Sequence, residues 1–160
     1  MVREFMRKTG DKIEAVLKVW QVAIFTVSIF CITFEVFMRF VLNSPTSWSE
    51  ELARFTMVWL ALLGLGTGIR RKDHIRIDNI IDVFPKPIRA LAAWVRYIVT
   101  FIFSLVLLVY GFRMAMINMT QITPGLAIPM GYVYMAVPIG AFLMLFYLLE
   151  LVVEGYRGTF

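Results

Sequence analysis

Five charged side chains lie within or at the start of two strongly apolar runs of this sequence. Glu35 and Arg39 lie within one apolar run, and Glu50, Glu51 and Arg54 lie at the start of the next. A charged side chain at the centre of a bilayer costs about 2.5–3.5 kcal/mol on insertion scales, so such residues are retained when they are paired or functional. The chemistry open to them is ion pairing, proton exchange at a carboxylate, or passage of an ion.

Their spacing predicts contacts between them. Glu35 and Arg39 are four residues apart, as are Glu50 and Arg54, so each pair shares one face of a helix. Counted from the turn between the two runs, Arg39 lies at the depth of Glu50, and Glu35 at the depth of Arg54. Arg113, near the far end of a third run, reaches the same level. We predict a neutral network of three carboxylates and three guanidiniums, whose members are Glu35, Arg39, Glu50, Glu51, Arg54 and Arg113.

Three interpretations of this network stay open. It can be a structural clamp that also shapes a protein interface. Alternatively, Glu50 and Glu51 are only capping and interfacial residues at the start of a helix. The third interpretation is a pathway for ions or protons.

Composition places these residues in a membrane. The chain has 160 residues, of which 60% are hydrophobic, whereas about 45–50% is typical of soluble domains. The net charge of +5 comes from basic residues at the ends of apolar runs, which predicts contact with membrane lipids and not with nucleic acid. Single Cys31 and His74 residues exclude an internal disulfide and a multi-histidine metal site. We expect no enzyme activity, no cofactor and no metal.

The predicted fold is an all-α integral membrane protein with one membrane domain. Four apolar runs exceed the length of about 20 residues that a transmembrane helix needs. Ser47 is expected to cap the second helix, with Glu50 completing a capping box after a short turn. The fourth helix is expected to bend near Pro138 and Gly140. The predicted transmembrane helices are 19–42, 48–69, 88–118 and 132–153.

Two amphipathic segments complete the prediction. Residues 1–18 carry five basic side chains and are expected to lie on the membrane surface, with an interruption at Gly10. Residues 75–84 are expected to form a short interfacial helix. Of the sixteen lysines and arginines, five lie in 1–18 and six in 70–89, whereas the loops after the first and third helices have none. The positive-inside rule therefore predicts that both termini are cytoplasmic.

Several motifs resemble those of one family. They are 37–43 (FMRFVLN), 48–55 (WSEELARF), 71–78 (RKDHIRID), 126–130 (LAIPM) and 134–140 (YMAVPIG). Together they resemble the small membrane subunit of tripartite ATP-independent periplasmic (TRAP) transporters. The resemblance covers nearly the whole chain in the right order, and the segment around Trp48 is its most specific part.

The resemblance implies an accessory subunit in the bacterial inner membrane. In this family a larger membrane subunit carries the substrate and sodium, and a periplasmic binding protein delivers an organic acid such as a dicarboxylate, a keto acid or sialic acid. This chain would support the large subunit as a separate polypeptide and help to receive the binding protein. The predicted network and Trp48 would lie at the subunit interface. The sequence has no evident inverted repeat or pair of broken helices, which also argues against a transport pathway in this chain.

Two other classes remain as alternatives. A small proton-coupled multidrug exporter would act as a homodimer through Glu35. However, Arg39 one turn away favours the charged carboxylate and opposes that role. A small assembly subunit of a membrane redox complex is disfavoured by the lone histidine and cysteine.

Overall fold

The chain folds into long helices with no strand among the described residues. The computed structural model describes residues 2–70 and 86–153. Within these ranges four helical stretches are long and apolar enough to cross a membrane, in agreement with the predicted all-α membrane fold. The elements are α1 (Val2–Phe40), α2 (Ser47–Arg70), α4 (Lys86–Ile117), the 3-10 helix η2 (Asn118–Thr120), α5 (Gly131–Tyr134) and α6 (Ala136–Val153).

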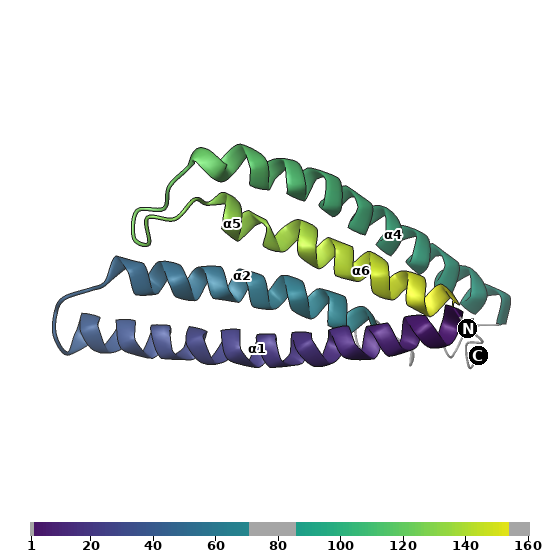
Figure 1. Ribbon diagram of the computed structural model, residues 1–160, viewed down its shortest axis with the longest axis horizontal. Helices are drawn as coiled ribbons and strands as arrows, with labels where there is room; N and C mark the ends of the chain where they lie inside the picture. The colour runs from purple at the N-terminus through teal and green to yellow at the C-terminus, as the bar shows by residue number, and fades with distance from the viewer. Residues whose placement is uncertain (1, 71–85, 154–160) are drawn as a thin grey trace.

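The long helices lie side by side in the order α1, α2, α6, α4 (Figure 1). The hairpin of α1 and α2 packs through α2 on α6, and α6 packs on α4. The connections 41–46 and 121–130 lie at one end of this layer, which we call the loop end. The starts of α1 and α4 and the ends of α2 and α6 lie at the other end, which we call the opposite end. Helices α2 and α6 are therefore central, and α1 and α4 are at the edges.

Helix α1 differs from the expected separate segments 1–18 and 19–42, because it continues without a break through Gly10. Its 39 residues span about 58 Å at 1.5 Å per residue, far more than a hydrocarbon core of about 30 Å. A side chain at position 10 would place its Cβ 2.6 Å from Oε2 of Glu150 on α6. The glycine thus lets the carboxylate of Glu150 approach α1 closely and does not interrupt the helix.

The fourth predicted transmembrane helix is divided into α5 and α6 at Met135. Pro138 has no N–H to donate, and its ring crowds the carbonyl of Tyr134, four residues earlier. The break therefore begins before the expected bend. Gly140 has a different role, because a Cβ there would lie 2.9 Å from the carbonyl oxygen of Leu62 on α2. The interfacial helix expected over 75–84 lies outside the described residues.

A buried apolar cluster lies between α2 and α6. Tyr147 is fully buried, and Leu63 and Leu143 pack with it. The outer surfaces of α1 and α4 are covered by exposed apolar side chains, including Phe30 and Phe103. Such surfaces suit a bilayer, where lipid tails are as apolar as the side chains.

Candidate functional site

A chain of ion pairs joins α1 to α2 at the loop end. Nη2 of Arg39 lies 2.6 Å from Oε1 of Glu35 and 3.5 Å from Oε2 of Glu50. Nη2 of Arg54 lies 2.8 Å from Oε1 of Glu50. Two pairs at four-residue spacing are thus linked across the hairpin by Arg39, and their four charges balance.

In this chain of ion pairs, one side chain is largely buried and the other three are exposed. The side chain of Glu35 is 12% exposed, whereas those of Arg39, Glu50 and Arg54 are 47%, 53% and 64% exposed. The helices are held together beneath it by a 2.5 Å hydrogen bond between the hydroxyls of Ser28 and Thr56. The carboxylate of Glu35 therefore lies largely inside the hairpin, and the remaining members lie on its surface.

Glu51 faces another part of the molecule. Its Oε2 accepts hydrogen bonds from the backbone N–H groups of Gly125 at 3.1 Å and Leu126 at 2.9 Å. A Cβ at position 125 would lie 2.9 Å from this oxygen, so glycine permits the approach. Adjacent helical residues point about 100° apart, which separates Glu51 from Glu50. Glu51 thus fastens α2 to the loop between α4 and α5.

That loop is ordered by its own hydrogen bonds. The N–H of Thr123 donates to the carbonyl of Ile128, and the N–H of Met130 donates to the carbonyl of Gln121. The N–H of Ile128 also donates to the hydroxyl of Thr123. Together with Glu51, these bonds hold an uncharged loop in one conformation at the loop end.

The other predicted site residues lie apart from the ion pairs. Arg113 is exposed on α4, with α2 and α6 between it and α1, and it makes no ion pair within the described part of the chain. Trp48 packs on Phe34 of α1 with ring centroids 5.7 Å apart. At the start of α2, hydrogen bonds join Thr46 to Ser49, whereas Glu50 is engaged with arginines.

A second charged cluster, at the opposite end, was missed by the sequence reasoning. Arg70 on α2 contacts Glu14 at 2.5 Å and Asp11 at 2.6 Å on α1, and Glu150 at 3.0 Å on α6. The side chains of Arg70, Glu14 and Glu150 are 12%, 14% and 4% exposed. Lys18 pairs with Glu14 at 2.9 Å. One guanidinium thus ties together three helices.

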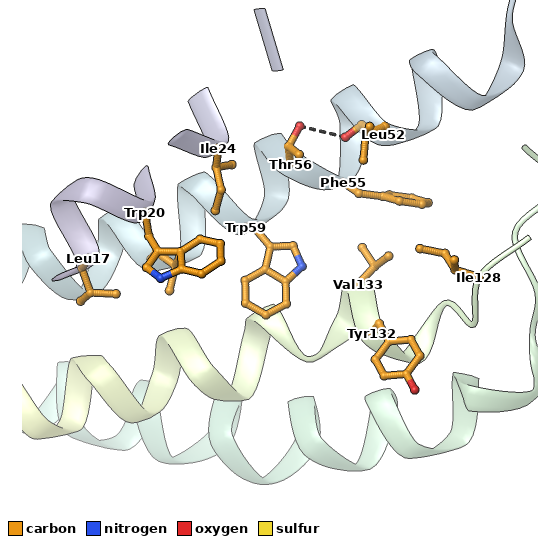
Figure 2. Close-up of a pocket in the computed structure, with 11 residues that line it drawn as sticks. Leu17, Trp20, Ile24, Leu52, Phe55, Thr56, Trp59, Ile128, Tyr132 and Val133 are labelled. Carbon is orange, nitrogen blue, oxygen red and sulfur yellow. Dashed lines mark hydrogen bonds between the residues drawn. The ribbon is translucent and has the colours of Figure 1, made fainter. Parts of the chain in front are cut away.

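An apolar groove of about 540 Å³ lies between α1, α2 and α5 (Figure 2). Trp20 and Trp59 line one part, and Tyr132 and Ile128 line the part nearer the loop end. The hydroxyl of Thr56 donates within its own helix, at 2.8 Å from the carbonyl of Leu52. The residues that line the groove include the hydroxyls of Thr56 and Tyr132 but no carboxylate, basic side chain or thiol. The described ranges also contain no group of three or more residues able to hold a metal ion.

Comparison with known proteins identifies the family. Residues 28–158 match the sequence family described as tripartite ATP-independent periplasmic transporters, DctQ component. The chain belongs to this family. The resemblance predicted from the sequence is thus confirmed, and this DctQ-type chain is a TRAP transporter small permease subunit, not an enzyme. With four helices in its described part that are long and apolar enough to cross a membrane, it is a multi-pass protein of the bacterial inner membrane. Small subunits of this kind work with a large permease subunit.

Three relatives are similar to this DctQ-type subunit. The sialic acid TRAP transporter small permease protein SiaQ of Vibrio cholerae is 27% identical over 94% of this chain and 85% of SiaQ. The C4-dicarboxylate TRAP transporter small permease protein DctQ of Rhodobacter capsulatus is 31% identical over 70% of this chain and 50% of that protein. The sialic acid TRAP transporter permease protein SiaT of Haemophilus influenzae is 28% identical over 70% of this chain, which spans 18% of SiaT.

Proposed function

We propose that this chain is the non-conducting subunit of a sodium-coupled, binding-protein-dependent TRAP transporter for an organic acid. A C4-dicarboxylate or sialic acid is the substrate class favoured by the names of its relatives. The large permease subunit would be a separate chain and would carry substrate and sodium. This chain would support it and help to dock the periplasmic binding protein.

The main support for this proposal is that the buried carboxylates are ion-paired with arginines. Glu35 is paired with Arg39, and Glu14 and Glu150 are bound by Arg70. Charges used in this way hold helices together and are not free to carry a substrate or an ion. The groove is apolar, so it offers no path for an organic anion.

The same contacts weigh against a homodimeric proton-coupled exporter. That mechanism needs a carboxylate in an accessible cavity, alternately binding a proton and a cationic drug. Glu35 is only 12% exposed and its carboxylate lies 2.6 Å from the guanidinium of Arg39, so it is engaged within the hairpin. The lining of the groove does not include Glu35.

Charge distribution supports a cytoplasmic opposite end and a periplasmic loop end. The connections 41–46 and 121–130 contain no charged residue, whereas Lys8, Lys12 and Lys18 lie near the start of α1. With this orientation the loop held by Glu51 faces the periplasm. A fixed loop loses little conformational entropy on binding, which suits it to help receive a soluble binding protein.

Reconstitution of the whole transporter tests the proposal. Liposomes would contain the large subunit with or without this chain. The binding protein and labelled dicarboxylate or sialic acid would be added outside, with a higher sodium concentration outside than inside. We expect sodium-dependent uptake only with all three proteins. Uptake that persists without this chain would refute a required supporting role, and drug efflux by this chain alone would favour the exporter.

A further inference from the structure

One face of α2 carries a regular stripe whose residues are exposed or half-buried in the described chain. Its residues follow one another at alternating steps of four and three, the spacing by which a helix meets a second helix. None of the stripe residues is buried, whereas the buried residues of α2, such as Ala53 and Leu63, point elsewhere. The stripe consists of Glu50, Arg54, Met57, Ala61, Gly64 and Gly68.

The stripe lies on the side of α2 away from the groove. The groove is lined on α2 by Leu52, Phe55, Thr56, Trp59 and Leu63. At about 100° per residue, the mean direction of these side chains is roughly half a turn from that of the stripe. The layer of helices therefore has an apolar grooved face and a second face on which α2 is open.

The charged part of the stripe is poorly suited to lipid. Helix α2 has 24 residues, or about 36 Å, against a hydrocarbon core of about 30 Å, and Arg54 lies about 10 Å from its start. The ion pairs of Arg39 and Arg54 use only Nη2 of each guanidinium. Each guanidinium carries five N–H donors, and a hydrocarbon surface cannot accept from the rest. A protein surface with oxygen acceptors can.

The small residues of the stripe point to a packed helix. A Cβ at position 64 would meet no atom within 4 Å, so nothing in the described chain requires glycine there. Gly66 contrasts with it, because a Cβ at position 66 would lie 2.8 Å from Cβ of Leu143. Small residues at four-residue spacing let two transmembrane helices approach closely, and Gly64 and Gly68 have that spacing.

We propose that this stripe, extended at the loop end by Arg39, is the face on which a transmembrane helix of the large permease subunit packs. The partner helix would present small residues opposite Ala61, Gly64 and Gly68, and hydrogen-bond acceptors opposite the two arginines. This inference rests on the proposed function, since it takes the large subunit to be a separate chain. It specifies which face of this chain is the interface.

A second copy of this chain fits the stripe less well. Two copies in one membrane share an orientation, so a symmetric contact places the same residues of both copies at the same depth. Arg54 would then meet Arg54, and Glu50 would meet Glu50. Like charges directly opposed are unfavourable, which argues for a different helix as the occupant.

Two matched alanine substitutions test the assignment. Ala61 and Ala23 are both exposed in membrane-spanning helices, but Ala61 lies in the stripe and Ala23 on α1. Each is replaced by leucine, and the tagged variant is co-expressed with the large subunit and purified. We expect A61L to reduce recovery of the large subunit at least tenfold and A23L to change it less than twofold. The yield and thermal melting of each variant purified alone should match the wild type.

Cysteine crosslinking supplies a second readout that does not depend on purification. An Ala61→Cys variant is crosslinked in membranes that contain the large subunit, in the C31A background to remove the native thiol. A crosslink to the large subunit is expected, and a crosslink mainly to a second copy would overturn the choice of occupant. Equal recovery of A61L and A23L would overturn the choice of face. Failure of the wild-type chain to bind the large subunit would instead contradict the proposed function.

Discussion

Replacing Arg70 with methionine removes the guanidinium that binds two helices to α2 at the opposite end. Methionine keeps much of the length and apolar volume of the side chain but none of its charge. Glu150, 4% exposed, and Glu14, 14% exposed, would keep their carboxylates and lose this counter-ion. Breaking a buried ion pair from one side costs about 3–5 kcal/mol. We expect R70M to lower the free energy of unfolding by that amount.

A matched change on the same helix gives the comparison. Arg54→Met also removes an arginine bound to a glutamate, but both side chains are more than half exposed. An exposed pair contributes about 1 kcal/mol or less, so R54M should leave the isolated chain nearly as stable as the wild type. The two variants thus separate the effect of burial from that of losing a positive charge.

Unfolding in mixed micelles, followed by tryptophan fluorescence as denaturing detergent is added, measures both variants. The double variant R70M/E150M should recover at least about 2 kcal/mol of the loss, because it removes both partners of a buried pair. A loss below about 1 kcal/mol for R70M would refute the clamp. Simple additivity of R70M and E150M would refute the direct coupling of these two residues.

Three further predictions concern Glu51, Gly125 and Arg54, which lie toward the loop end. Glu51→Gln weakens the hydrogen bonds to the backbone amides of Gly125 and Leu126, each of which contributes about 1.5–3 kcal/mol with a charged acceptor. Exchange of those amides should therefore accelerate in hydrogen-exchange mass spectrometry, and unchanged exchange would contradict the attachment of the loop to Glu51. Gly125→Ala should lower the free energy of unfolding by about 1–3 kcal/mol through overpacking. Gly64→Ala has open space for its Cβ, so the isolated variant should be at least as stable as the wild type. Equal melting temperatures of the two variants would contradict this contrast. Arg54→Ala should reduce co-purification with the large subunit more than the double change with Glu50→Ala, because the single change removes the 2.8 Å partner of Glu50 and leaves it only the 3.5 Å contact with Arg39. Equal recovery would contradict a paired role.

Features set by local spacing were predictable from the sequence. The length of the apolar runs was enough for four membrane-spanning helices. The pairs of Glu35 with Arg39 and Glu50 with Arg54 follow from positions four residues apart. The short turn between the first two helices also explains why Arg39 reaches Glu50 across the hairpin. Each of these contacts needs knowledge of one helix or one turn only.

Features set by the order of helices in the layer were not predictable in the same way. Depth alone grouped Arg113 with the ion pairs, but α2 and α6 separate its helix from α1. Glu51 has the right depth yet points toward the loop that it binds. Arg70 meets Glu150 across 80 positions of sequence, which no local spacing could indicate. An interruption of the helix was expected at Gly10, because the contact of this glycine with Glu150 on α6 cannot be inferred from local sequence.

Transport by a Glu35→Gln variant tests most directly whether the charges of this chain assemble the transporter or carry ions. The complex would be purified with the large subunit, reconstituted with the binding protein, and its sodium-driven uptake divided by the amount of intact complex. If Glu35 only joins helices, uptake per complex should stay within about twofold of the wild type, since less than 1 kcal/mol of barrier height separates such rates. Loss of uptake in a fully assembled complex would contradict this account and place Glu35 on an ion or proton pathway.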